Sequence, residues 1–125
     1  MSNRASKLLG AGIAAAAANQ IAGDVQTAVS AAGTTQATAT AVYGDNVQVT
    51  TVGASSGVIL SGPTFGPGDD VFIANNTGTN ALTVYPPVGG QINALGTNAG
   101  FSIGANKSAL FRSIGNGQFF ALLSA

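Results

Sequence analysis

A chain of 125 residues provides for one domain and a short arm, and its 46% content of hydrophobic residues argues against disorder throughout. Only 6% of the residues are charged, against roughly 25% in an average soluble domain, and the formal net charge is zero. Such a composition gives no electrostatic footprint for nucleic acid, and no apolar run approaches the roughly 20 residues that span a bilayer. A surface with so little charge is expected to be covered by copies of the same chain or by a partner protein.

The residue types that most enzymes use are scarce. The chain has no His, no Cys and no Glu, which removes the commonest general base, disulfides and thiolate metal sites. Asp69 and Asp70 form a carboxylate pair, but they lack the ligand spacing and the closing Glu of a calcium loop. We interpret them as turn residues that hydrogen-bond to nearby backbone. We therefore expect no catalytic residue, no metal and no cofactor, and a structural subunit rather than an enzyme.

Residues 1–33 are rich in Ala, the best helix former, and are predicted to form a helical N-terminal arm. Ser2 or Asn3 can cap a first helix, and Gly23 ends it. A weak apolar stripe at helical spacing consists of Leu9, Ile13, Ala16, Ala17, Gln20 and Ile21. An Ala-rich helix buries little surface, so the arm should depend on packing against another surface.

A second short helix is predicted after the first, with Asp24 as its N-cap and Gly33 at its end. Val25, Ala28, Val29 and Ala32 would share one of its faces.

The first residues of the arm also resemble a secretory signal. Arg4 and Lys7 would be its basic part, residues 8–18 its apolar part, and the Ala run at 16–18 its cleavage site. The apolar part consists mostly of Ala, which is weakly hydrophobic, so we expect the segment to be retained.

Residues 34–125 are rich in Gly, Thr, Asn, Val and Phe, and short apolar runs alternate there with turn residues. This pattern is typical of a compact antiparallel β-sandwich or a barrel-like domain, and no fixed-period repeat indicates a solenoid. Strands are predicted at residues 37–43, 47–52, 58–60, 70–75, 81–85, 91–93, 101–103, 107–113 and 118–123.

The end of the chain has the clearest hairpin pattern, with a turn at Gly115, Asn116 and Gly117. Successive side chains of a strand point to opposite faces, and residues 119–123 are apolar on both. We expect this last strand to be buried on both sides, in the core or at a contact between subunits. The predicted interface residues are Leu9, Ile13, Ile21, Phe119, Phe120, Leu122 and Leu123.

Part of the sequence resembles small structural proteins of tailed bacteriophages. A "V-x-I-x-N" strand at residues 70–76 is followed by "L-x-V-Y-P" at 81–86, by an "I-N" step at 90–93, and by a closing hairpin that starts at 106–111 and ends in an aromatic strand at 120–125. The resemblance covers roughly residues 57–125 and leaves out the arm. It is a packing pattern and carries no catalytic signature.

The resemblance implies a virion protein on the capsid exterior, which decorates and stabilises the shell by bridging neighbouring capsid subunits. Its partners would be the major capsid protein and further copies of itself, with a homotrimer as the expected state, and neither nucleic acid nor a membrane. Two alternatives stay open: a tail- or fibre-associated structural module, and a secreted, adhesin-like surface domain.

Overall fold

In the computed structural model of the chain, residues 7, 9–15, 17, 25–61 and 65–125 are described. This part is mainly β, as the sequence predicts, and it has one short 3-10 turn, η1 (Gln36–Thr38). Its strands are β1 (Val25–Ser30), β2 (Thr40–Val42), β3 (Asn46–Thr51), β4 (Gly57–Leu60), β5 (Asp70–Asn75), β6 (Leu82–Tyr85), β7 (Gln91–Ile92), β8 (Phe101–Ile103), β9 (Ser108–Gly115) and β10 (Gln118–Leu123).

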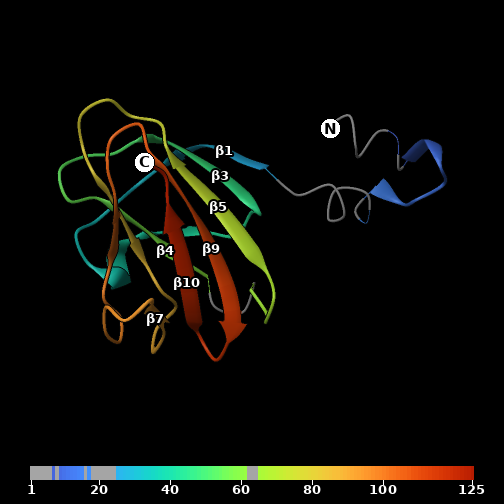
Figure 1. Cartoon of the computed structure of the whole chain (residues 1–125). Helices are drawn as coiled ribbons and strands as arrows, with labels where there is room; N and C mark the ends of the chain where they lie inside the picture. Colours follow the sequence, from blue (N-terminus) through green and yellow to red (C-terminus); the bar gives the residue numbers. More distant parts are fainter. Residues whose placement is uncertain (1–6, 8, 16, 18–24, 62–64) are drawn as a thin grey trace.

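The strands form two sheets. The six-stranded sheet has the order β1-β3-β5-β9-β10-β7, and the four-stranded sheet has the order β2-β4-β6-β8 (Figure 1). From β1 to β6 the chain alternates between the sheets, so each strand pairs with the strand two places earlier. These pairs are parallel, because the chain crosses the other sheet before it returns in the same direction.

The predicted antiparallel topology is therefore wrong for the first half of the domain, and both sheets are mixed. Antiparallel pairing begins with β8 and β9, and of the antiparallel pairs only β9 and β10 follow each other directly within one sheet. β8 runs against β6, and β9 runs against both β5 and β10. The predicted hairpin is confirmed: β9 and β10 meet at a turn in which Gly115, Asn116 and Gly117 all have positive φ.

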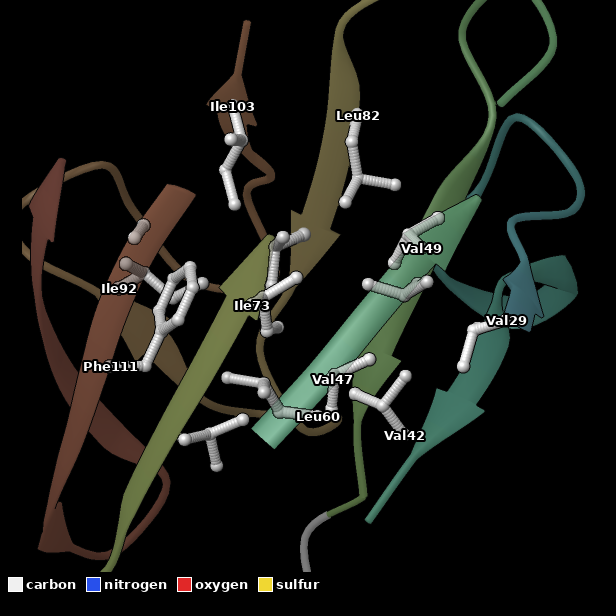
Figure 2. Packing of buried hydrophobic residues seen from close by; sticks show 14 of the residues in the cluster. Val29, Val42, Val47, Val49, Leu60, Ile73, Leu82, Ile92, Ile103 and Phe111 are labelled. Atoms are coloured by element: carbon white, nitrogen blue, oxygen red, sulfur yellow. The ribbon is translucent and has the colours of Figure 1, made fainter. Parts of the chain in front are cut away.

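The core lies between the two sheets. Figure 2 shows side chains of the six-stranded sheet, among them Val47, Ile73 and Phe111, pointing toward Leu60 and Leu82 of the four-stranded sheet. All of these side chains are buried and belong to one hydrophobic cluster. In β3, β5 and β9 the buried residues alternate with exposed or half-buried ones, as a strand with one face on a core requires.

Several strand predictions are confirmed closely, and β5 and β8 have the predicted bounds. The predicted strand at residues 37–43 is shorter in the structure, because its first residues belong to η1 and β2 begins at Thr40.

The second predicted helix is wrong, because its residues form β1. Val25 and Gln26 pair with Asn46 and Val47 of β3, and Val29 is buried in the core. Helical spacing of small apolar residues is a weak signal, and tertiary pairing overrides it here. The sheet therefore starts before Gly33, where the sequence places the end of the arm.

Part of the first predicted helix lies within the described residues. The Ala11 amide donates to the Lys7 carbonyl at 3.2 Å, which closes one helical turn. Gly12 follows it with a φ of 93°, a left-handed value that ends a helix readily. The predicted helix is therefore interrupted at Gly12. Residues 2, 3 and 18–24 lie outside the described part, so the rest of the helical arm stays a prediction.

One buried polar side chain connects the two sheets. Asn75, at the end of β5, is 1% exposed. Its amide donates to the carbonyls of Asn80, Ile103 and Gly104 at 2.9, 3.0 and 3.2 Å. Its side-chain oxygen accepts a hydrogen bond from the Thr77 hydroxyl at 2.7 Å. Since Ile103 belongs to β8, this network ties the six-stranded sheet to the four-stranded one.

Candidate docking surface

The outer face of the six-stranded sheet, which points away from the core, carries large apolar side chains. The outward residues of β5, β9 and β10 include Phe72, Leu110, Ile114, Phe120 and Leu122. Phe72, Phe120 and Leu122 are 40%, 53% and 74% exposed. We use the name outer face for these five residues together with Asp70 and Arg112.

Strand register brings these side chains together. Phe72 of β5 lies opposite Leu110 of β9, which in turn lies opposite Leu122 of β10. Directly opposite residues on one face of an antiparallel pair have Cβ atoms about 5 Å apart. The three side chains therefore form a continuous apolar row across the middle of the sheet.

A second row beside the first contains an ion pair. Asp70 of β5 lies opposite Arg112 of β9, and Arg112 lies opposite Phe120 of β10. Arg112 donates from Nε to Asp70 Oδ1 at 2.6 Å and from Nη2 to Oδ2 at 3.0 Å, a bidentate contact. The Arg112 guanidinium holds the pKa of the Asp70 carboxyl below its ordinary value of 3.8, and the carboxylate raises the pKa of Arg112.

The outer face has a shallow hollow of about 350 Å³ near β10. It is lined by the apolar side chains of Leu110, Phe120, Ala121 and Leu122 and by the polar ones of Asn93 and Arg112. A second, more polar hollow of about 460 Å³ lies at the end of β5, and it is lined by Gln48, Phe72, Ala74, Asn75, Asn76, Asn106, Lys107 and Ser108. Leu110 and Leu122 of the apolar row thus line the first hollow, and Phe72 at the other end of the row lines the more polar one.

The outward side of the four-stranded sheet is different in character. Its half-buried residues include Thr83 and Tyr85 of β6, and the Tyr85 hydroxyl donates to the Thr34 carbonyl at 3.2 Å. The Gln36 side chain donates to the Pro86 carbonyl at 2.8 Å, so the segment around η1 packs against this side. The chain itself thus covers part of the second sheet, whereas the outer face is bare in the described part of the structure.

The sheet edges offer little for a partner strand. β1, at one edge of the six-stranded sheet, has register shifts around Ala28, whose φ is 54°. β7, at the other edge, has only two residues. Irregular and very short edge strands are poor templates for strand addition, which leaves the outer face as the accessible contact surface of this sheet.

The predicted interface residues divide into three groups. Phe120 and Leu122 lie on the outer face, and Leu123, 47% exposed, is at the end of β10 opposite Ala109. Phe119 is 1% exposed and packs edge-on against Phe65 with ring centroids 6.2 Å apart. Phe119 is therefore a core residue, which corrects its assignment to an interface. Within the chain, β10 is buried on one face only.

The predicted interface residues in the arm do not belong to the outer face. Leu9 and Ile13 are half-buried, and Ile21 lies outside the described residues. Sequence reasoning missed Phe72, Leu110 and Ile114 as interface candidates. Alternation along β5 and β9 could have placed each on an outward face, but their proximity to Leu122 depends on strand register.

The acidic pair of the sequence does not form one site. The Asp69 carboxylate accepts a hydrogen bond from the Gly66 amide at 2.8 Å, so it is the turn residue that the sequence predicts. Asp70 instead pairs with Arg112. Among the described residues, no three acidic side chains lie close enough together to hold a metal ion.

No helix in the described part of the chain has the length and apolar content that crossing a membrane requires.

Comparison with known proteins gave no match: no protein-family model, no curated protein and no solved structure shows significant similarity to this chain.

Proposed function

We propose that the chain is a non-enzymatic structural subunit of a bacteriophage particle, which decorates the capsid exterior and stabilises the shell by bridging neighbouring capsid subunits. The outer face is its principal contact surface in the assembly. The domain that carries this face is a sandwich-like body with its hydrophobic core between the two sheets.

The observation that supports this proposal is the uncovered apolar face in a chain with very little charge. Monomeric soluble proteins rarely expose contiguous apolar patches larger than a few hundred Å², and larger ones mark interaction sites. Only four basic and four acidic residues are present to keep copies apart in solution. A protein whose task is assembly gains from both properties, because contact then removes apolar surface from water with little desolvation of charge.

Bridging several capsid subunits would act by multivalency. Each contact can be weak, because once one contact forms the next becomes intramolecular. Release of a capsid subunit would then require several contacts to break together, and this is how such a subunit stabilises a shell without any chemical step.

The test is whether the protein is a stoichiometric part of a particle. Particles that lack this protein are mixed with the purified full chain and sedimented, and bound copies per particle are counted by quantitative gel analysis. We expect saturable binding in many copies, and an increase in the temperature at which the shell releases its genome. Absence of binding, or binding without any change in shell stability, would contradict the capsid role.

The number of bound copies also distinguishes the capsid role from the main alternative. A tail- or fibre-associated module would saturate at a few copies per particle and would leave shell stability unchanged. A secreted, adhesin-like domain would not bind the particles, and it would be recovered from culture medium with a shortened N-terminus.

A further inference from the structure

We propose that the outer face packs against the same face of a second copy of this chain, about a two-fold axis. This inference rests on the proposed function in one respect, that the outer face is buried in an assembly. It adds that a second copy of the chain covers this face.

The first argument is that the apolar surface forms a single patch. Among the other large apolar residues that are exposed in the described part, Tyr43, Val88 and Leu95 lie singly in connections between strands, and Val25 lies at the start of the edge strand β1. A ring of three copies needs two different complementary patches on each copy, whereas a two-fold contact uses one patch twice. One contiguous apolar patch in the middle of a sheet suits the two-fold arrangement.

The second argument is charge complementarity. The outer face carries one acid, Asp70, and one base, Arg112, side by side on adjacent strands. In a two-fold contact the carboxylate of each copy can approach the guanidinium of the other, so four alternating charges form a network. Arg112 already uses its Nε and Nη2 atoms for Asp70 of its own chain, and its remaining donors are free to contact a carboxylate of the second copy.

The third argument is area. Five of the six strands, β1, β3, β5, β9 and β10, have six to eight residues, so at about 4.8 Å per strand their outward side is about 24 Å wide and about 20 Å long. Two such faces bury about 1,000 Å² together, which is near the lower limit for a specific protein–protein contact. The expected product is therefore a reversible dimer whose population depends on protein concentration.

The absence of cysteine makes a direct test possible, because a single introduced thiol is then unique. Leu122→Cys places it on the outer face, and Val88→Cys places it at an 81% exposed position between β6 and β7 as the matched control. The reaction rate with a thiol reagent is measured on the full chain at low and high protein concentration. We expect the Leu122→Cys thiol to react more slowly at high concentration and the Val88→Cys thiol to react equally fast at both.

Sedimentation equilibrium supplies the stoichiometry. The wild-type chain should show a monomer–dimer equilibrium. Leu122→Asn should raise the dimer dissociation constant by at least about tenfold, because it buries an amide in the apolar row of the contact. Val88→Asn serves as its control, and far-ultraviolet circular dichroism checks that both variants remain folded.

A wild-type chain that stays monomeric at all concentrations would overturn the proposal. So would a trimer, the state that the bacteriophage resemblance implies, or a dimer in which the Leu122→Cys thiol stays reactive. The proposed function fails by a different result, since a chain that dimerises through this face but never binds particles keeps the two-fold contact and loses the capsid role.

Discussion

Asp70 and Arg112 are the charged residues of the outer face, and their side chains remain 42% and 62% exposed despite the bidentate contact. An exposed ion pair contributes little to folding stability, because water and salt screen it. Its clearer effect is on orientation, since two hydrogen bonds hold the Arg112 guanidinium of β9 beside the Asp70 carboxylate of β5. The pair thus fixes the arrangement of charge on a face that otherwise has none.

This pair predicts a pH dependence with a definite sign. The pKa of Asp70 is lowered in the folded chain, so the unfolded chain takes up the proton at higher pH. The stabilisation is therefore complete above the ordinary value near 3.8 and is lost as pH falls through the lowered folded value. Chemical denaturation of the wild type between about pH 2 and pH 6 should show this loss, and Asp70→Asn should flatten it over that range. An unchanged slope in Asp70→Asn would contradict the assignment.

At the scale of the element, β10 shows how one strand serves two purposes. Phe119 and Ala121 face inward, Phe119 as part of the buried core and Ala121 packed against it, and Phe120 and Leu122 alternate with them on the outer face. The run of apolar residues at 119–123 therefore reflects two different surfaces, and only the inward one belongs to the core.

Two adjacent substitutions separate these surfaces. Phe119→Ala should lower the free energy of unfolding by about 3–5 kcal/mol, because it leaves a cavity between the sheets. Phe120→Ala should lower it by about 1 kcal/mol or less, because this side chain is 53% exposed and lies outside the core. Denaturant unfolding of both variants, at concentrations where the chain is monomeric, measures the difference. Equal losses would mean that the outer face is part of the folded core.

At the scale of the whole molecule, the two sheets are joined by apolar packing and by the buried Asn75 network. The Asn75 amide reaches three carbonyls, including that of Ile103 in the opposite sheet. Each of these carbonyls would lose a hydrogen-bond partner if the amide were removed, and an unsatisfied buried polar group is costly. Asn75 therefore fixes how the end of one sheet sits on the other.

Asn75→Asp tests this role with almost no change in side-chain shape. A carboxylate at this position faces three carbonyl oxygens instead of donating to them, and we expect a loss of about 2–4 kcal/mol in the free energy of unfolding. The control is Asn76→Asp at the neighbouring exposed position, which should change stability by about 0.5 kcal/mol or less. Comparable losses in both variants would show that the network does not tie the sheets together.

The sequence by itself determines the β-rich class, most of the strands and the closing hairpin. These features are local: Gly, Asn and Pro turn signals separate short apolar runs, and alternation of side chains follows from the strand backbone. The sparse charge is likewise a property of composition, and it predicts assembly without any knowledge of the structure.

Only the tertiary structure decided the pairing of the strands. Parallel pairs such as β3 with β5 join segments that are separated in the chain by a strand of the other sheet. No local sequence pattern indicates which strand will be the pairing partner. The same pairing turned the residues of the expected second helix into β1. Register then decided the outer face, because Phe72, Leu110 and Leu122 are far apart along the chain and become neighbours only when three strands align. The physical reason is that sheet contacts are non-local, so the sequence determines which side chains point outward while the fold determines which of them meet.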